Sequence, residues 1–493
     1  MIGKLFEADK VCTDVCREIS DKEPTGQEDS DSVIDNLTIL KSIVVTSIPP
    51  IAGLLFELLV QVVNLIFVGN LNNPAALGGV GLANMLLNVV CFSIGMGLNG
   101  AIDTLVSQAY GNHKYYLCGC YLNRGRIIQA MFFIPEVIIL LFTKEILILL
   151  AQEEDAADYG RTYVLILLLG IFTMTQFETV RRYLQGMEIF SLIMCIQCVT
   201  MVIHITMCYI LVFTYELGVE GTSIATCITY WLNLLIITGC ITFREGVVPE
   251  GSWLFFNNEC IKGLWEFLKV WNHSNLNALT CRVVFCIQFK VGFLEVNELA
   301  VNVVLFNTLA VLFVIPNGIS FTISALVGNS MGKGNPPKEK CHYLTAIHLA
   351  LVIFLREDIA FIYTQEPNVV KLVVSNLPYF SLMMFFDDLQ AVTSGTVRAI
   401  GYQDYGSWLA LVGFWVFSAP LAYIFSHVVG LRLVGIWLGV PVGTLFFTIS
   451  YNLTCTFVHQ KTYQTPSNSD SPTNNQIPKS PLLPHNPPSP NLS

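Results

Sequence analysis

The sequence reads Leu105-Val106-Ser107-Gln108-Ala109-Tyr110-Gly111-Asn112 where one long apolar segment ends, and Leu326-Val327-Gly328-Asn329-Ser330-Met331-Gly332-Lys333 where another ends 221 positions later. A second pair recurs at nearly the same distance, because Arg182 before Gly186 has its counterpart in Arg398, 216 residues on. A repeat of about half the chain, built from membrane-length segments, is typical of two-lobed transporters. Such proteins bind a substrate between the repeats and expose the site to each side of the membrane in turn.

The composition places most of the chain in a membrane. Hydrophobic residues make up 53% and charged residues 13% of the sequence, whereas soluble domains carry about 25% charged residues. The net charge of −10 and the absence of a basic run argue against a nucleic-acid partner. The fifteen cysteines fall mostly within apolar stretches, which favours buried free thiols over disulfides.

We predict an all-α polytopic membrane protein with about 12 transmembrane helices in two pseudo-symmetric six-helix lobes. The apolar segments are 43–69, 77–106, 124–143, 160–180, 188–213, 218–243, 264–292, 298–327, 341–364, 372–396, 404–428 and 433–458. The predicted domains are a disordered acidic tail (1–36), an N-lobe (37–245), an inter-lobe loop (246–262), a C-lobe (263–460) and a disordered tail rich in Pro, Ser and Asn (461–493).

The basic residues of the predicted loops set the orientation. With the first terminus in the cytoplasm, the cytoplasmic loops hold Lys114, Arg124, Arg126, Arg181, Arg182, Arg244, Lys262, Lys333, Lys338, Lys340 and Arg398. The opposite loops then hold Lys144, Arg161, Arg356, Lys371 and Arg432. This excess predicts that both termini are cytoplasmic.

Several classes of site have no counterpart in the sequence. No Gly-rich loop ends in Lys-Ser or Lys-Thr, no Gly-x-Ser-x-Gly elbow occurs, and His342 and His348 lack the spacing of a zinc helix. We therefore expect neither an enzyme nor a metal or cofactor, and we expect a monomer that contacts the lipid bilayer and small organic solutes.

Six motifs occur in a recognisable order. They are Ile66-Phe67-Val68-Gly69-Asn70-Leu71, Asp103-Thr104-Leu105-Val106-Ser107-Gln108-Ala109-Tyr110-Gly111, Arg182-Tyr183-Leu184-Gln185, Tyr230-Trp231-Leu232-Asn233, Ile315-Pro316-Asn317-Gly318-Ile319-Ser320 and Phe385-Phe386-Asp387-Asp388-Leu389-Gln390-Ala391. With these motifs the chain resembles the eukaryotic branch of the multidrug and toxic compound extrusion (MATE) family over residues 40–460. The resemblance implies two six-helix bundles, a central cleft that opens to alternate sides, and efflux of organic compounds in exchange for H⁺ or Na⁺, across the plasma or a vacuolar membrane.

The first apolar segment carries the polar residues Glu57, Gln61 and Asn64 at i, i+4 and i+7, so they lie on one helical face. A polar face within an apolar helix is expected to point into the lobe, where it binds an ion or substrate or joins helices by hydrogen bonds. Prokaryotic relatives have an ion-binding Asp where Asn64 aligns. An amide can coordinate Na⁺ but carries no proton, so Asn64 alone is no proton site.

Other polar residues of the first half are weaker candidates. Gln176 and Glu178 fall in the fourth segment, whereas Gln197 and His204, which share a face, fall in the fifth. A histidine that joins helices is the more frequent alternative to a proton relay. Asp103 belongs to a family motif, yet an interfacial carboxylate that caps a helix or pairs with an arginine is the favoured reading.

Asp387 is the main candidate of the second half, and Asp388 is the weaker one because it points about 100° away on a helix. By resemblance, two acids are expected in the seventh segment, where Thr280 and Phe285 stand instead, and Lys290 is new. We predict that Lys290 approaches Asp387, since a buried lysine needs a partner. A less acidic lobe would shift preference toward neutral or anionic substrates.

The ninth segment is unusually short. Only 15 residues separate Lys340 from Arg356, whereas a spanning helix needs about 17–25. A deletion or an error in the gene sequence explains this equally well. Two alternatives to an antiporter remain open: a degenerate membrane protein without transport activity, and a flippase for a lipid-linked substrate.

Overall fold

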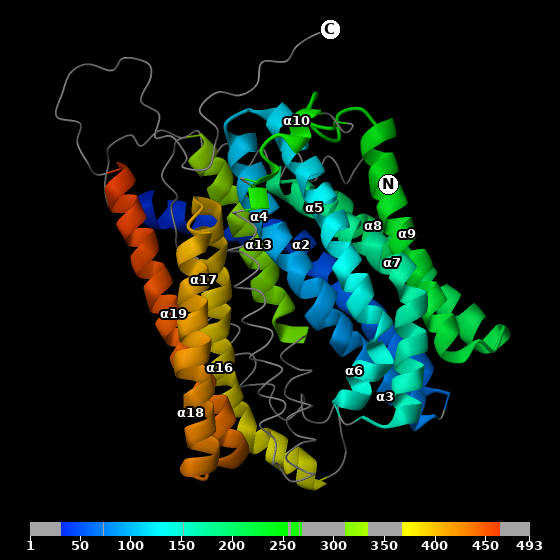
Figure 1. Cartoon of the computed structure of the whole chain (residues 1–493). Helices are drawn as coiled ribbons and strands as arrows, with labels where there is room; N and C mark the ends of the chain where they lie inside the picture. Colours follow the sequence, from blue (N-terminus) through cyan, green and yellow to red (C-terminus); the bar gives the residue numbers. More distant parts are fainter. Residues whose placement is uncertain are drawn as a thin grey trace, which may run out of the picture. The chain divides into compact units, whose positions relative to one another are not determined.

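The computed structural model describes residues 31–71, 73–150, 152–254, 258–265, 267–268, 311–333 and 367–463. Within these ranges the regular structure is entirely helical (Figure 1). Residues 298–310 of the predicted segment 298–327, most of 264–292 and all of 341–364 lie outside the described residues, as do Thr280, Phe285 and Lys290. The approach of Lys290 to Asp387 therefore stays a prediction.

The first half of the chain forms a series of long helices joined by short turns. In order they are α2 (Asp31–Gly69), α3 (Pro74–Leu87), η1 (Asn88–Phe92, a π-helical turn), α4 (Ser93–Gly111), α5 (Tyr115–Leu141), α6 (Thr143–Leu149), α7 (Glu154–Gly186), α8 (Ser191–Tyr209), η2 (Ile210–Thr214), α9 (Gly218–Phe243) and α10 (Asn258–Ile261). The predicted segment 77–106 is thus built from α3, η1 and α4, with a π-helical turn in its middle.

The described part of the second half also consists of helices. They are α13 (Val314–Gly332), α16 (Pro367–Ile400), α17 (Gln403–Leu411), η3 (Val412–Ser418), α18 (Ala419–Tyr423), η4 (Ile424–Val428) and α19 (Arg432–Tyr463). The elements from α17 to η4 follow one another without a gap and make one apolar span, Tyr405–Val428.

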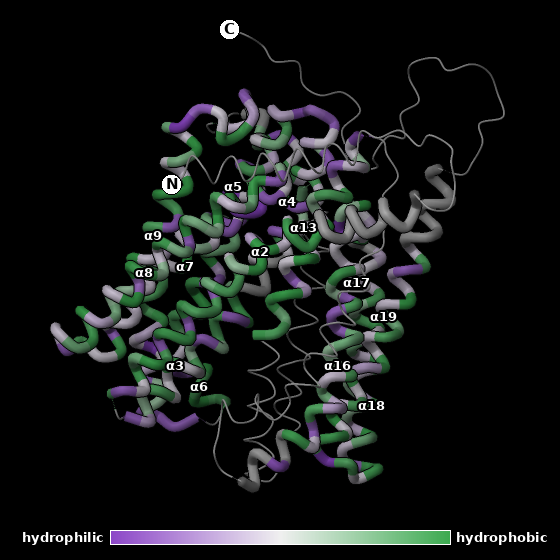
Figure 2. Tube along the Cα trace, turned by 180° about the vertical axis from the view of Figure 1, so that it is seen from behind, coloured by the Kyte–Doolittle hydropathy of each residue, from purple (hydrophilic) through white to green (hydrophobic). Residues whose placement is uncertain are grey.

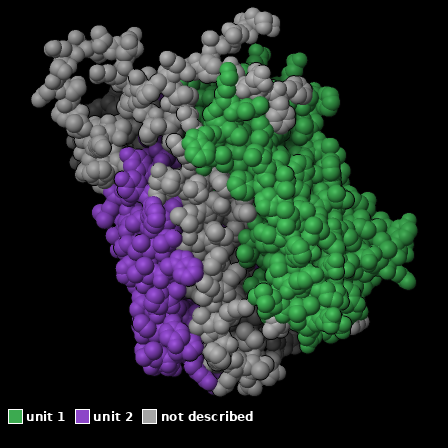
Figure 3. Space-filling view, viewed as in Figure 1, with its two compact units in different colours: residues 1–11, 52–275, 483–493 green, residues 12–51, 276–482 purple. Residues whose placement is uncertain are grey.

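Two compact units emerge, one from each half of the chain (Figure 3). Among the described residues, those of 52–275 belong to unit 1, and those of 12–51 and 276–482 belong to unit 2. The division falls inside α2, directly after Pro49 and Pro50. Proline removes a backbone hydrogen bond and clashes with the preceding turn, so this is the weakest point of the helix.

Among the described residues, seven helical segments are long and apolar enough to cross a membrane. They are Ile43–Gly69, Pro74–Cys91, Glu154–Gly186, Ser191–Thr214, Gly218–Phe243, Tyr405–Val428 and Arg432–Thr454. Apolar residues dominate these helices, and hydrophilic residues gather at several of the turns that join them (Figure 2). Outward-facing side chains such as Leu169, Val202 and Leu453 are mostly exposed, as lipid-facing residues are.

Small residues bring the helices of unit 1 into close contact. Gly79 of α3 faces α7 so closely that an added Cβ would lie 2.4 Å from the carbonyl oxygen of Ala156 and 2.9 Å from the nitrogen of Gly160. Apolar side chains of α2, α3, α7 and α9 then pack into one core, which includes Val68, Val80 and Leu167. Close approach over glycine is how membrane helices gain packing energy without a hydrophobic driving force.

The glycine contact gives a first prediction. Gly79→Ala is expected to lower the free energy of unfolding by about 1–3 kcal/mol, because the new methyl group overpacks the α3–α7 contact. Gly78→Ala is the matched control, since an added Cβ at Gly78 meets nothing within 4 Å. Alanine favours a helix over glycine by roughly 0.8–1 kcal/mol, so this control is expected to be neutral or stabilising. Thermal unfolding of both purified variants in detergent measures the difference, and equal effects would contradict the predicted contact.

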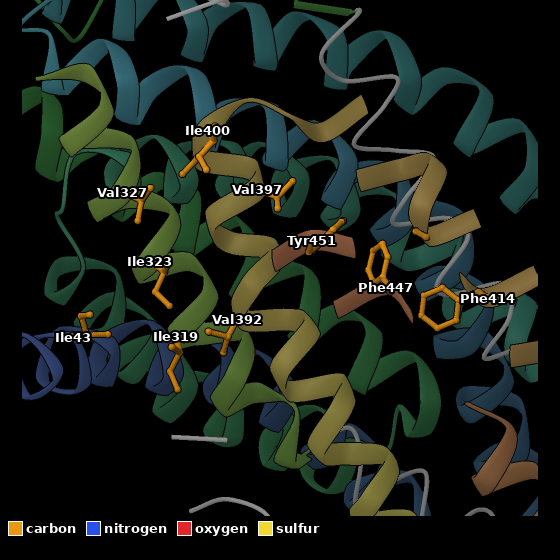
Figure 4. Close-up of a cluster of buried hydrophobic side chains, with 12 residues drawn as sticks. Ile43, Ile319, Ile323, Val327, Val392, Val397, Ile400, Phe414, Phe447 and Tyr451 are labelled. Atoms are coloured by element: carbon orange, nitrogen blue, oxygen red, sulfur yellow. The ribbon is translucent and has the colours of Figure 1, made fainter. Parts of the chain in front are cut away.

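Unit 2 has its own core, in which α13, α16 and α19 pack together (Figure 4). The rings of Phe447 and Tyr451 of α19 contact each other at a tilt, with centroids 4.2 Å apart, and lie beside Phe414 of η3. Ile43, from the first part of α2, packs into the same core with Ile319. This explains why the first part of α2 groups with unit 2.

The predicted inter-lobe loop, 246–262, is bonded to helices of unit 1. Tyr183 Oη donates a hydrogen bond of 3.0 Å to the carbonyl oxygen of Ser252. Asn123 Nδ2 donates to the carbonyl oxygen of Leu254 at 3.1 Å, and Arg124 Nε donates to that of Cys260 at 3.1 Å. The loop is therefore held along its length against α5 and α7.

Five arginines expected in cytoplasmic loops lie within helices instead: Arg124 and Arg126 in α5, Arg181 and Arg182 in α7, and Arg398 in α16. Arg181 and Arg182 are each 3% exposed. Each has a carboxylate partner, which is what allows a guanidinium to be buried. The prediction of free thiols is confirmed for the nine cysteines whose surroundings the structure describes.

Candidate functional site

Glu57, Glu178 and Arg181 form a buried ion cluster, which we call the ion triad. Arg181 Nη1 donates to Glu57 Oε2 at 2.9 Å, and Arg181 Nη2 donates to Glu178 Oε2. Glu178 and Arg181 share a face of α7 because they stand three positions apart, and Glu57 reaches them from α2. Two carboxylates face one guanidinium, so the ionised cluster has a surplus of one negative charge.

The ion triad borders a pocket in unit 1, which we call the triad pocket. Its walls mix acidic, amide, hydroxyl and aromatic groups: Phe56, Glu57, Val60, Met174, Phe177, Glu178, Gln197, Thr200, Thr229, Tyr230 and Asn233. Two of its acceptor atoms, Glu178 Oε1 and Gln197 Oε1, are buried without a hydrogen-bond partner among the described residues. The pocket thus offers negative charge and open acceptors to a guest that donates hydrogen bonds or carries positive charge.

Asn64 is the centre of a second polar cluster. It is fully buried, and its Nδ2 donates to Tyr163 Oη at 3.1 Å and to Thr226 Oγ1 at 2.8 Å. The thiol of Cys208 lies 3.7 Å from Asn64 Oδ1. Both Nδ2 hydrogens are therefore used in joining α2 to α7 and α9, and the weak thiol contact adds α8, so the amide acts as a link between four helices.

His204 links the Asn64 cluster to the triad pocket. Its Nε2 lies 3.5 Å from the Cys208 sulfur, and its Nδ1 lies 2.9 Å from Thr229 Oγ1. Thr229 lines the triad pocket, whereas Asn64 lines a neighbouring pocket. His204 thus joins α8 to α9, as expected for a histidine that links helices. Through Cys208 and Thr229 it also connects polar groups of the two pockets.

Gln61 and Gln176 do not reach the ion triad. Gln61 lines the neighbouring pocket together with Asn64. Gln176 is buried, and its Nε2 donates to the carbonyl oxygen of Arg126 on α5 at 3.4 Å. The candidates on α2 and α7 are therefore divided between two pockets and a helix contact.

Asp103 pairs with Arg182, as the architectural reading of its motif expects. Arg182 Nη1 lies 3.4 Å from Asp103 Oδ2, and both side chains are at least nine-tenths buried. The pair joins α4 to α7, where Arg182 directly follows Arg181 of the ion triad. It neutralises two charges inside the unit and leaves no surplus.

Asp387 and Asp388 both lie inside unit 2, on α16. Asp387 is 4% and Asp388 1% exposed, although successive residues of a helix point about 100° apart. The α16 helix packs against α13 on one side and α19 on another, which accounts for burial in both directions. Buried carboxyl groups are costly in a membrane and are usually functional there.

Sequence reasoning missed two residues of unit 1. Arg181 was counted as a loop charge, although its spacing of three from Glu178 signals an ion pair within a helix. Glu136, a lone acid in the apolar run of α5, was not singled out and is 1% exposed. An isolated acid within an apolar helix is the signal that could have found it.

Comparisons with known proteins assign the chain to a family. The MatE family model matches residues 49–210 and 277–424, which is more than half of the sequence. The chain belongs to the MATE family. Protein DETOXIFICATION 16 of Arabidopsis thaliana is 30% identical over 409 residues, which are 80% of this chain and 82% of that protein. Multidrug and toxin extrusion protein 2 of Mus musculus is 28% identical over 82% of this chain and 72% of its own length.

The MATE fold is also present in solved structures. The crystal structure of the eukaryotic MATE transporter AtDTX14 superimposes with a TM-score of 0.79 at 25% identity, over 85% of this chain and 97% of that one. A MATE structure in the bent conformation matches in fold with a TM-score of 0.75 at 19% identity. The chain is thus an all-α, multi-pass membrane protein, and as a MATE protein it belongs to a family of transporters rather than enzymes.

Proposed function

We propose that this MATE protein is a secondary active antiporter that exports organic solutes in exchange for H⁺ or Na⁺ by alternating access. The observation that carries the proposal is the triad pocket, in which the surplus negative charge of Glu57, Glu178 and Arg181 meets two open acceptor atoms. Both halves of the chain contain buried carboxyl groups, which in a membrane are usual at ion and proton sites.

The charge of the triad pocket favours a cationic solute. A cation and the coupling ion would compete for the same surplus charge, which links the two movements in opposite directions. Phe56, Phe177 and Tyr230 add aromatic faces, which attract organic cations. The acids missing from the seventh segment favour neutral or anionic substrates instead. The charge of the transported solute therefore tests the role of the triad pocket.

Transport by the purified full chain in liposomes tests the proposal. With an imposed H⁺ or Na⁺ gradient, a fluorescent quaternary ammonium dye is expected to cross the membrane in the direction opposite to the ion. It is also expected to move faster than a fluorescent organic acid. Faster movement of the organic acid would contradict the role given to the triad pocket. No movement of either dye under either gradient would overturn the antiport itself and favour a protein without transport activity.

The same proposal includes the setting of the transporter. The excess of lysine and arginine in the predicted cytoplasmic loops supports cytoplasmic termini, even after Arg181 and Arg182 are removed from the count. We propose a monomer in the plasma or a vacuolar membrane. Protease accessibility of the two tails in sealed vesicles measures the orientation directly.

A further inference from the structure

Glu136 lies on α5 and is not part of the triad pocket. Its side chain is 1% exposed, and both carboxyl oxygens are buried without a hydrogen-bond partner among the described residues. Burial makes the ionised carboxylate the most costly state of the group. A protonated carboxyl group has no charge and needs only an acceptor for one O–H.

The side chain beside Glu136 is the thiol of Cys91. Cys91 is 1% exposed and interacts with the carboxyl group of Glu136. The elements that pack against α5 are α4, α7, α10 and η1, and within their described residues Cys91 is the ionisable group that acts on Glu136. No guanidinium or ammonium among them neutralises the carboxyl group, so a proton is the species that can do so.

Cys91 belongs to η1, the π-helical turn between α3 and α4. A π-helical turn inside an α-helix strains the regular hydrogen-bond pattern and is frequent at functional sites. A change of this turn toward α-helical geometry would rotate Cys91 relative to Glu136.

Cys91 also lines the neighbouring pocket, together with Asn64 and Asn84. Asn84 Nδ2 is buried there without a hydrogen-bond partner in the described part of the chain. An open amide donor in a polar pocket is a place where water can bind, if the pocket supplies further polar partners such as Gln61. Water in this pocket would be separated from Glu136 by the Cys91 side chain.

We propose that Glu136 is a proton-binding site of unit 1, separate from the ion triad. It exchanges its proton with the neighbouring pocket that Asn84 lines, by way of the Cys91 side chain. Rearrangement of η1 would open the exchange. The link to transport rests on the proposed antiport, whereas proton binding itself does not.

Infrared spectroscopy tests proton binding on the full chain reconstituted in lipid, without substrate and without a gradient. A spectral band of a protonated carboxyl group in apolar surroundings is expected near neutral pH. The band is expected to vanish in Glu136→Gln and to shift in Cys91→Ser. It should remain in Glu153→Gln, because Glu153 is exposed. A band that Glu136→Gln leaves unchanged would overturn the proposal.

The design keeps the outcomes separate. Should Glu136→Gln fail to accumulate, the Cys91→Ser shift decides, since that variant keeps the carboxyl group, and an unshifted band would overturn the proposal. Should the wild type bind this proton but move no dye, the antiport fails and the proton site stands. Should both hold, Glu136→Gln is expected to flatten the pH dependence of dye efflux, whereas Glu153→Gln leaves it as in the wild type.

Discussion

Arg181→Ala is expected to destabilise the protein by about 3–5 kcal/mol, the usual cost of removing one partner from a buried ion pair. The substitution leaves Glu57 and Glu178 facing each other without a cation, and both carboxyl groups line the triad pocket. Repulsion and lost hydrogen bonds then act together. Thermal unfolding in detergent and the amount of protein in the membrane measure the loss.

Two further variants make the result specific. Arg161→Ala is the matched control on the same helix, because Arg161 is exposed, and it is expected to change stability by less than roughly 0.5 kcal/mol. Arg181→Lys keeps the charge but lacks the planar fork that serves two carboxylates at once, so an intermediate loss is expected. Equal stability of Arg181→Ala and Arg161→Ala would contradict the ion triad.

Asp387→Asn is expected to abolish coupled efflux while the protein still reaches the membrane. The amide has nearly the same shape as the carboxyl group but neither binds a proton nor carries charge, so folding is spared and coupling is lost. Because Asp387 is 4% exposed on α16, a carboxyl group there is retained at a cost of about 2.5–3.5 kcal/mol, which implies a function. Dye efflux from liposomes under an ion gradient measures the change.

The control for Asp387 is a carboxylate that is exposed at the start of a helix. Glu220→Gln in the first turn of α9 is expected to leave efflux at the wild-type rate. Asp388→Asn separates the two neighbouring acids, and we expect a smaller loss than for Asp387→Asn. Wild-type efflux by Asp387→Asn would remove this residue from the mechanism.

Much of the fold could be predicted because a protein that spans a membrane needs long apolar segments, which are visible in the sequence. Segment 218–243 coincides with α9, and 433–458 lies within α19, because a spanning helix must be continuously apolar. Helix ends were less accurate: 160–180 falls short of α7 at both ends, since its last turns carry polar residues such as Arg181 and Gln185 that are buried by protein rather than lipid.

The candidate site was predictable in kind but not in pairing. Polar residues within apolar segments pointed to Glu57, Asn64, Glu178 and His204, and the structure buries or half-buries each of them. Their partners come from distant segments, such as Arg181 for Glu57 and Tyr163 for Asn64. The spacing of residues along one helix shows that they share a face. It does not show which neighbouring helix packs against that face.

The sequence by itself determined the class of protein: two repeats of apolar, membrane-length helices with acids placed where hydrocarbon penalises them, arranged in the motif order of the MATE family. The tertiary structure alone decided how each acid is treated. Glu57 and Glu178 share an arginine, Asp103 has one of its own, and Glu136 faces a thiol with no cation. The reason is physical: desolvation cost is set by composition along one helix, whereas its compensation depends on which side chains neighbouring helices bring within a few ångströms.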